Sequence, residues 1–394
     1  MTRNRTNAGR AIARHMLPLV GVAVLLVISS VQAFAGSDER KGTAGATELL
    51  IPVGPRGTAL GSTITSDVVG VESAFWNPAG LGSVERTEAM FSHTQYIADM
   101  NLNYAAVAVK AGGFGGLGFT AKVLSIGDVI VTTEDAPEGT GETLNPTFAV
   151  LGLSWGREFT DRVRFGASAQ YVIESVASAR ASGMAFDFGV QYAPGWHGLK
   201  LGMVMKNFGP TMQFSGADFE VNLPPPGATP ATPNRTFSST TAGFEMPSYF
   251  SLAGSYDLWS ANQQHLAVLG SFQNNNFELD NFVGGLEWKY REDYALRASY
   301  FGSYGGTFNA ATGEEDNPEF NKGNDLYTGL ALGAGASIRV LRGGIMGSFA
   351  FAVFFLIVGI GLGRLGIGAT YVLASVGSIA LNGAVLSVGR GLFR

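Results

Sequence analysis

The stretch Val163-Arg164-Phe165-Gly166-Ala167-Ser168-Ala169-Gln170-Tyr171-Val172-Ile173-Glu174 alternates in character with a period of two. In a β-strand, its apolar side chains at odd positions would share one face, and Arg164, Gln170 and Glu174 would lie on the other. The run is about twice as long as the usual strand of about five or six residues. A tilted strand that crosses a bilayer needs about nine to eleven residues. The stretch therefore has the pattern and length of a membrane-spanning strand.

The same alternation recurs along most of the chain. Asp187 stands between two phenylalanines, Lys200 and Lys206 alternate with leucine and methionine, and Glu287, Lys289 and Arg297 alternate with apolar residues. Twelve strands can be drawn in this way, at residues 88–95, 103–110, 115–125, 147–158, 163–176, 183–193, 198–208, 249–257, 265–273, 281–290, 294–302 and 326–339.

The apolar faces of these strands could contact either a protein core, as in a soluble β-protein, or lipid, as in a membrane barrel. A soluble β-protein would bury its apolar faces, but strands of this length would then require one very large core. Charged residues make up only 14% of the chain, against roughly 25% in soluble domains, which favours lipid. Open sheet edges are not tolerated in hydrocarbon, so the sheet must close. We therefore predict an all-β fold, a transmembrane antiparallel β-barrel in contact with outer-membrane lipid, with a soluble β-protein as the alternative.

In such a barrel the polar faces line the lumen. The predicted lumen-facing polar residues are Arg164, Gln170, Glu174, Asp187, Lys200, Lys206, Glu287, Lys289 and Arg297. We expect opposite charges among them to pair with each other and with water rather than to catalyse a reaction.

The connections between the predicted strands also fit an outer-membrane barrel. Short turns alternate with long loops at 126–146, 209–248 and 303–325, so the long loops all fall at one end, as extracellular loops do. The remaining fifty or so residues leave room for two more strands, and fourteen would satisfy the even-number rule. The Pro-rich loop 209–248 disfavours any ladder. The acidic outer loops are either solvated surface or a rim that binds a partner.

The N-terminus has the features of a targeting signal. Four arginines precede an apolar run at 16–31 and the small-residue site Ala33-Phe34-Ala35, the pattern of a secretory signal peptide. A permanent membrane anchor is the alternative. We predict a signal peptide at 1–35, an N-terminal hatch or plug segment at 36–87 and an outer-membrane barrel at 88–394.

The composition and the motifs give no sign of an enzyme. The chain contains no cysteine and has a net charge of −5, which excludes thiolate chemistry and disfavours nucleic-acid binding. The glycine spacing at 113–118 matches a dinucleotide fingerprint, but the residues after it read as a strand rather than a helix. We therefore predict no catalytic residue, no metal site and no cofactor.

The segment before the first strand contains Trp76-Asn77-Pro78-Ala79-Gly80. Asn-Pro marks a tight turn, because proline fixes its own φ and restricts the residue before it. Small residues on both sides would let this turn pack inside a lumen. From the residues alone the segment is either a plug or a periplasmic extension.

Several motifs resemble those of the PorV/PorQ family. They are Gly-Pro-Arg-Gly-Thr-Ala-Leu-Gly at 54–61, Phe-Trp-Asn-Pro-Ala-Gly-Leu at 75–81, Phe-Ser-His-Thr-Gln-Tyr at 91–96, the 132–142 loop, and Leu-Gly-Met with Asn-Phe-Gly-Pro at 201–210. That family is similar to the FadL-like barrels, in which an N-terminal hatch carries an Asn-Pro-Ala turn inside fourteen strands. The resemblance would place Trp76, Asn77, Pro78, Ala79 and Gly80 in the hatch.

The resemblance also implies a function. PorV-type proteins belong to the type IX protein secretion system, so the partners would be secreted cargo proteins and secretion-system subunits, bound through the extracellular loops and rim. The alternative is a FadL-like channel for hydrophobic small molecules, in which the hatch gates a pocket.

The C-terminus departs from the family pattern. Residues 343–363 and 365–389 carry no charge, and the polar–apolar alternation is lost. Taken alone they look like two transmembrane helices. We hypothesise that 343–394 is a frameshifted or misassembled version of the two closing strands, which resequencing of the gene would test.

Overall fold

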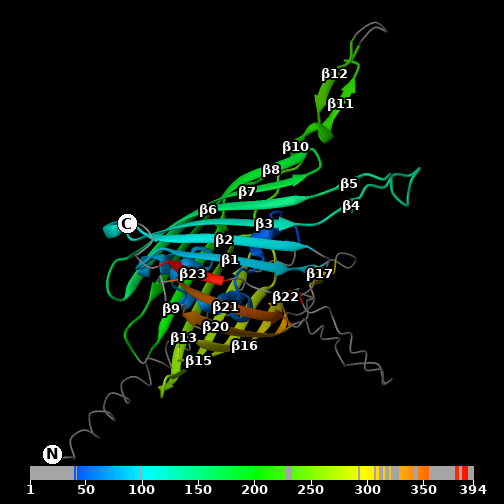
Figure 1. Ribbon diagram of the computed structural model, residues 1–394. Helices are drawn as coiled ribbons and strands as arrows, with labels where there is room; N and C mark the ends of the chain where they lie inside the picture. The colour runs from blue at the N-terminus through cyan, green and yellow to red at the C-terminus, as the bar shows by residue number, and fades with distance from the viewer. Residues whose placement is uncertain are drawn as a thin grey trace, which may run out of the picture. The chain divides into compact units, whose positions relative to one another are not determined.

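The computed structural model of the protein is built mainly of long antiparallel strands (Figure 1). The structure describes residues 40, 42–97, 100–196, 198–227, 233–291, 293–305, 308–309, 314–315, 319–320, 328–339, 345–354, 378–380 and 384–388. The predicted signal peptide at 1–35 lies outside these residues. Within them, no helix has both the length and the apolar character that crossing a bilayer requires.

The wall of the fold is one antiparallel sheet in which each long strand pairs with the next along the chain. Its strands are β1 (Glu88–Gln95), β2 (Asn101–Lys110), β3 (Gly116–Ser125), β6 (Thr147–Glu158), β7 (Val163–Val176), β8 (Ala179–Tyr192), β9 (Lys200–Phe208), β13 (Tyr249–Ala261), β14 (Gln264–Asn275), β15 (Asp280–Tyr290), β16 (Tyr294–Gly305), β20 (Gly329–Arg339), β21 (Ile345–Phe354) and β23 (Ala384–Val388).

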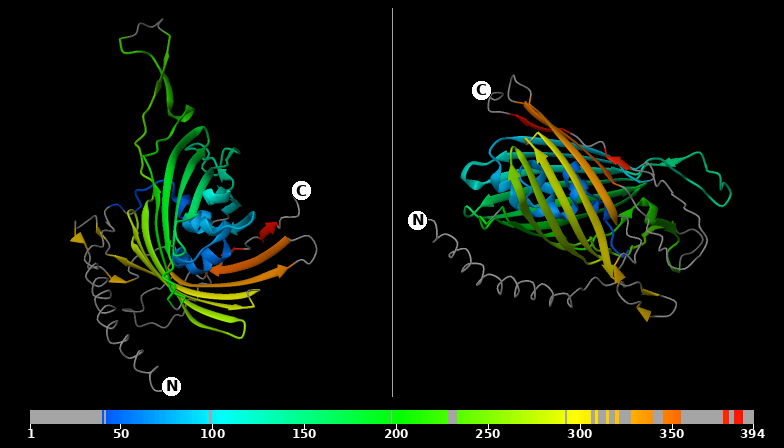
Figure 2. Two further views of the ribbon diagram at one scale, coloured as in Figure 1. Left: turned by 90° about the vertical axis from the view of Figure 1, so that its left-hand side faces the viewer. Right: turned by 90° about the horizontal axis from the view of Figure 1, so that it is seen from below.

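The last of these strands leads back to the first. β23 pairs with β21 from Phe349 to Ile345 and with β1 only at Glu88, Ala89 and Met90. Pairing thus returns to β1 through a seam of three residue pairs, compared with five pairs between β21 and β23. The curvature of the sheet into a barrel wall is visible in Figure 2, and the predicted fold class is confirmed.

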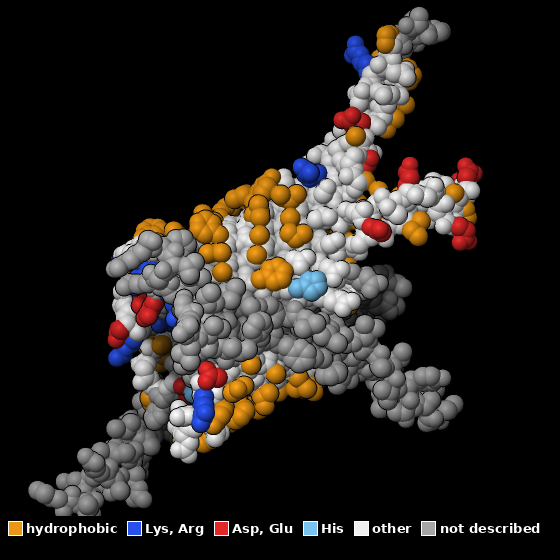
Figure 3. Space-filling model, viewed as in Figure 1, with side chains coloured by type: hydrophobic (Ala, Val, Ile, Leu, Met, Phe, Trp, Pro, Cys, Tyr) orange, Lys and Arg blue, Asp and Glu red, His pale blue; other side chains and the backbone are white. Residues whose placement is uncertain are grey.

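The two faces of the wall differ as the alternation predicts. On β9, Leu201, Met203 and Met205 are 43%, 45% and 38% exposed, whereas Val204 and Lys206 are 0% and 1% exposed. Figure 3 shows hydrophobic side chains gathered over the outside of the wall. An apolar exterior around a polar interior is the arrangement of a barrel immersed in lipid.

The interior is filled by residues 42–84, which we call the hatch. It consists of short α-helices and 3₁₀-helices, the latter labelled η. In chain order they are η3 (Thr47–Leu50), α2 (Pro55–Leu60), η4 (Gly61–Ser66), η5 (Gly70–Glu72), α3 (Ser73–Trp76) and η6 (Pro78–Ser83). Figure 2 shows this blue segment enclosed by the strands. Leu60, Ile64 and Leu81 are completely buried, so the apolar core lies between the hatch and the inner wall.

One expectation about the long loops is wrong. Inside the Pro-rich loop, β11 (Glu220–Leu223) pairs with β12 (Arg235–Ser238) in a ladder whose residues are all exposed. The prolines do not prevent it, because Pro224 to Pro226, Pro230 and Pro233 all fall between the two strands rather than within them. The smaller strands of the loops and the tail are β4 (Val129–Ile130), β5 (Thr143–Leu144), β10 (Ser215–Gly216), β17 (Phe308–Asn309), β18 (Glu314–Glu315), β19 (Glu319–Phe320) and β22 (Ser378–Ala380). Two short 3₁₀-helices are η8 (Gly112–Phe114) and η9 (Ala217–Phe219).

The helical reading of the tail is also wrong where the tail is described. Ile345–Phe354 is strand β21, paired along its length with β20. Its sequence alternates in size rather than in polarity, with Phe349 and Phe351 between serine and alanine residues, a pattern that a search for polar–apolar alternation misses. The frameshift hypothesis for 343–394 stays a prediction.

Candidate functional site in the lumen

The Asn-Pro turn joins two parts of the hatch to the wall. Asn77 is completely buried. Its Oδ1 accepts a hydrogen bond from Ala79 N at 3.1 Å and thereby caps the start of η6. Its Nδ2 donates to Thr65 O at 2.8 Å and to Val190 O of β8 at 3.2 Å. One side chain therefore fixes η6 to η4 and to the barrel.

The wall beneath this turn is lined by glycines on three neighbouring strands. A Cβ at Gly156, Gly166 or Gly189 would collide with Pro78 or Asn77 of the hatch. Only glycine lets the hatch backbone approach so closely. We call Gly156, Gly166 and Gly189 the glycine-lined wall. None of these glycines is among the predicted lumen-facing residues, although all three occupy inward positions of alternating strands.

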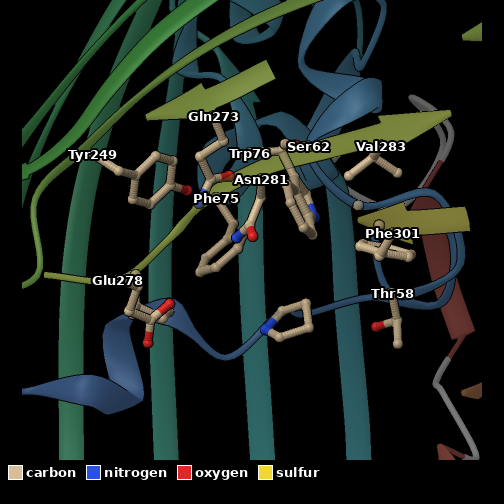
Figure 4. A pocket seen from close by; sticks show the side chains of 14 residues that line it. Thr58, Ser62, Phe75, Trp76, Tyr249, Gln273, Glu278, Asn281, Val283 and Phe301 are labelled. Carbon is tan, nitrogen blue, oxygen red and sulfur yellow. The ribbon is translucent and has the colours of Figure 1, made fainter. Parts of the chain in front are cut away.

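On the other side of the hatch, Phe75 and Trp76 border a cavity of about 80 Å³, which we call the outer pocket. Trp76 Nε1 donates to Val53 O at 3.0 Å, and the ring of Phe75 meets the indole edge-on with centroids 5.2 Å apart. Figure 4 shows the wall side chains that complete the pocket, namely Tyr249, Gln273, Asn281, Val283 and Phe301.

The outer pocket lies toward the long-loop end of the barrel. Tyr249 is the first residue of β13, and Asn281 is the second of β15. Both strands begin where the chain returns from that end. The lining is mainly aromatic and aliphatic, with Thr58, Ser62, Gln273 and Asn281 as uncharged polar groups and the carboxylate of Glu278 as a charged one. Such a lining suits a small apolar molecule.

Two buried lysines of the wall hold the hatch backbone. Lys206 Nζ donates to Phe75 O at 2.6 Å, and Lys122 Nζ donates to Ile51 O at 2.6 Å. Lys206 Nζ also lies 3.8 Å from Asp187 Oδ2. The predicted residues Gln170, Asp187 and Lys206 are therefore brought together, since Gln170 Nε2 donates to Asp187 Oδ2 at 2.6 Å. Lys122 was missed, although it stands at an inward position of β3.

A second charged cluster links the hatch to β15 and β16. Arg56 donates to both oxygens of Glu287, from Nε and Nη2, at 3.0 Å each. Its Nη2 also donates to Asp67 at 2.8 Å. Glu287 further contacts Arg297 at 2.7 Å and Lys289 at 3.4 Å. The structure thus brings together three predicted residues, and the hatch supplies Arg56 and Asp67 as their partners.

A larger cavity, of about 350 Å³, lies at the short-turn end; we call it the inner vestibule. Arg56, Arg164, Lys200 and Lys289 line it together with Arg162 of the turn between β6 and β7. Arg164 pairs with Glu158 at 2.7 Å. The vestibule is therefore bordered by these five cations and by the carboxylates of Asp67 and Asp161, in contrast to the mainly apolar outer pocket.

The remaining predicted residue, Glu174, contacts the start of the hatch. Its Oε1 accepts a hydrogen bond from Ala46 N at 3.0 Å. Burial raises the pKa of the nearby Glu48 carboxyl to about 8, and the Glu174 carboxyl raises it further while Lys122 opposes the shift. A buried carboxyl with this pKa retains its proton near neutrality.

None of these clusters has the composition of a metal centre. In the part of the chain that the structure describes, no three His, Asp or Glu side chains are grouped to hold a metal ion. The buried cations Lys122, Lys206 and Arg56 bond to carboxylates or to hatch backbone. The lumen is thus organised to hold the hatch and to leave two cavities beside it.

A barrel with an apolar exterior and a plugged, charged lumen is an outer-membrane β-barrel, and its place is the bacterial outer membrane. No protein-family model matches the chain, and no curated protein matches it.

Solved structures with a similar overall fold include two monoaromatic hydrocarbon channels and a FadL homologue. The monoaromatic hydrocarbon channel TodX, as a ΔS2S3 mutant, is 12% identical with a TM-score of 0.48, over 86% of this chain and 97% of the other. The monoaromatic hydrocarbon channel CymD is 11% identical with a TM-score of 0.46, over 86% and 96%. A Pseudomonas aeruginosa FadL homologue is 12% identical with a TM-score of 0.41, over 86% and 95%. At these values the likeness is one of overall fold, and none of them bears on the PorV/PorQ resemblance specifically.

Proposed function

We propose that the protein is a non-enzymatic channel that admits small hydrophobic molecules through the outer membrane by way of the barrel lumen. The observation that carries this proposal is the outer pocket, an aromatic cavity between the hatch and the wall at the long-loop end. It lies where a molecule that enters from outside would first meet the hatch.

The chemistry of the pocket supports an apolar ligand. The N–H group of Trp76 is already bonded to Val53 O, so the indole offers the cavity its apolar surface. Phe75, Tyr249, Phe301 and Val283 provide further apolar surface. Burying apolar area contributes about 25 cal/mol per Å², and aromatic side chains give much area with little loss of conformational freedom.

Uptake of N-phenylnaphthylamine tests the proposal. This apolar aromatic dye fluoresces when it passes the outer membrane, and cells that carry the protein should take it up faster than cells that lack it. Val283→Phe fills the pocket and should return uptake to the rate of cells without the protein. Val268→Phe is the matched control, because Val268 lies on the outer face and is 38% exposed, whereas Val283 is 5% exposed.

The proposal fails if the protein does not increase dye uptake, or if Val283→Phe and Val268→Phe take up dye equally fast. Both variants should first be shown to fold, by the shift in gel mobility between heated and unheated samples that intact barrels display.

The type IX secretion role rests on the sequence motifs alone. It predicts that secreted cargo and secretion-system subunits bind the extracellular loops and rim. A pull-down from solubilised membranes separates the two functions, because recovery of exported proteins that share a C-terminal β-domain would favour secretion. Recovery of a bound apolar small molecule without such proteins would favour the channel.

A further inference from the structure

Four aromatic side chains form a continuous cluster on the outside of the barrel at the short-turn end. Phe114 lies in η8, Trp155 on β6, Phe159 in the turn after β6 and Phe165 on β7. The ring centroids of Phe114 and Trp155 lie 5.5 Å apart. Phe165 lies 6.3 Å from Trp155 and 6.3 Å from Phe159. We call these four residues the aromatic patch.

The aromatic patch belongs to the lipid side of the wall. A Cβ at Gly156 would collide with the hatch backbone, so this position faces inward. Trp155 and Arg157 therefore point outward, because side chains alternate along a strand. Phe114 and Phe159 are 57% and 61% exposed, and Figure 3 shows the hydrophobic outer surface reaching this end of the wall, on the left. Aromatic girdles of this kind mark the membrane interface of a barrel, and short turns face the periplasm.

Arg157 stands within the aromatic patch. It follows Trp155 by two residues on the same face of β6 and lies directly opposite Phe165 in the ladder with β7. Its neighbour Glu158 stands on the inward face and pairs with Arg164 at 2.7 Å. In contrast, no hydrogen bond or ion pair joins the exposed Arg157 side chain to any residue that the structure describes. Its guanidinium is therefore available to a ligand outside the barrel.

The level of Arg157 along the strand matches the lipid headgroups. Leu151 and Leu153 occupy the same face nearer the middle of β6, and each is 51% exposed, as expected beside acyl chains. Arg157 comes after the girdle residue on the turn side, where the lipid phosphates lie. Asp161 and Arg162 of the following turn pair with each other at 3.8 Å, which leaves the positive charge of Arg157 uncompensated. A guanidinium binds a phosphate through two parallel N–H donors.

We propose that Arg157, framed by the aromatic patch, binds the phosphate of an anionic phospholipid in the periplasmic leaflet. The acyl chains of that lipid lie along the apolar outer face of β6. An anionic lipid is favoured over a zwitterionic one, because the cationic headgroup of the latter competes with Arg157 for the phosphate. Such a site holds the barrel at a fixed depth in the bilayer, and it does not depend on what the lumen transports.

Native mass spectrometry of the purified protein in detergent tests the site. Phosphatidylglycerol and phosphatidylcholine with identical acyl chains are added separately, and the wild type should bind phosphatidylglycerol more tightly. Arg157→Gln should weaken phosphatidylglycerol binding about fivefold, the usual contribution of one arginine near an anionic lipid surface. Arg235→Gln is the matched control, because it removes the same charge from the exposed hairpin strand β12 and should bind like the wild type.

Photolabelling shows where the lipid binds. Phosphatidylglycerol with a photoreactive headgroup, reconstituted with the protein in phosphatidylcholine vesicles, should label peptides that cover 155–165 more strongly than the other short turns. Arg157→Gln should lose this excess. The variant should fold, since the Arg157 side chain makes no bond within the described structure, and the shift in gel mobility on heating verifies it.

Three results would overturn the lipid site. Equal binding of the two lipids by the wild type would show that no anionic headgroup is recognised. Equal weakening in Arg157→Gln and Arg235→Gln would show that the overall charge of the protein, rather than a site, attracts the lipid. Photolabelling spread evenly over the short turns would show that the aromatic patch holds no lipid in place.

Discussion

The ammonium group of Lys206 lies 3.8 Å from the centroid of the Phe75 ring and donates a hydrogen bond to Phe75 O at 2.6 Å. The wall thus holds the aromatic residue of the outer pocket through both its backbone and its ring. Because Lys206 is 1% exposed and its counter-ion Asp187 is equally buried, removing this contact should lower the free energy of unfolding.

Lys206→Met should therefore destabilise the barrel. Removing one partner of a buried ion pair costs about 3–5 kcal/mol, because the other charge is left uncompensated. Urea unfolding in detergent micelles measures the loss. Lys206→Met with Asp187→Asn should recover most of it, since replacing both partners of a buried pair is often nearly neutral. A double variant as unstable as the single one would show that the bond to Phe75 O, rather than the charge pair, stabilises the fold.

Gly189→Ala should loosen the hatch from the glycine-lined wall. The added Cβ would collide with Asn77 Oδ1, and overpacking of this kind costs about 1–3 kcal/mol. The expected readout is faster cleavage of the hatch by protease added to the folded protein. Gly284→Ala is the control, because nothing lies within 4 Å of a Cβ at that outward-facing position. Equal protease resistance of the two variants would contradict the close fit of η6.

The Glu48 carboxyl makes stability depend on pH. Its pKa of about 8 in the folded chain lies above the ordinary value of 4.5, through burial first and Glu174 second. The folded state thus binds the proton more tightly than the unfolded state, and this contribution to stability is lost as the pH rises from 4.5 through 8. Lys122, which also faces Glu48, opposes the effect.

Thermal unfolding in detergent at pH 6 and pH 9 tests this linkage. The wild type should lose more stability between the two pH values than Glu48→Gln, which cannot ionise. Equal losses in the two proteins would remove Glu48 as the titrating group.

A charge introduced at an outward-facing position should destabilise the protein only where that position contacts lipid. Leu286→Arg places a cation on the lipid side of β15 and should destabilise the protein by about 2–4 kcal/mol if the site is near the midplane. Leu223→Arg on the exposed hairpin strand β11 should cost less than about 0.5 kcal/mol. The two leucines are 47% and 49% exposed, so only their solvent differs. Equal costs in unfolding experiments would argue against lipid around β15.

Most of the wall could be predicted from the sequence. The strands drawn at 88–95, 147–158 and 163–176 have the observed bounds, because strict alternation over many residues has few other structural meanings. The strand at 179–192 begins four residues before its predicted start at 183. Its first outward-facing residues, Arg180 and Ser182, are polar, so the alternation with apolar residues outside is absent there.

The candidate site was harder to predict, because it depends on contacts between distant segments. The sequence indicates that Glu287, Lys289 and Arg297 share a face, but not that Arg56 enters between them from 231 positions away. The glycine-lined wall was missed for a related reason. A glycine in a strand shows that space is needed, but which backbone fills that space is decided only by the fold.

One face of each strand meets lipid while the other meets the hatch. Because the chain has no cysteine, single cysteines can be placed at 201, 203, 204 and 205 of β9, spin-labelled and reconstituted in lipid vesicles; Gly202 is left unchanged, because a Cβ there would collide with the hatch backbone. We predict that labels at 201, 203 and 205 collide readily with dissolved oxygen, a lipid-soluble relaxant, and that a label at 204 collides with neither oxygen nor a water-soluble nickel chelate. Four labels equally accessible to the nickel chelate, or a label at 204 as accessible to oxygen as its neighbours, would contradict this arrangement.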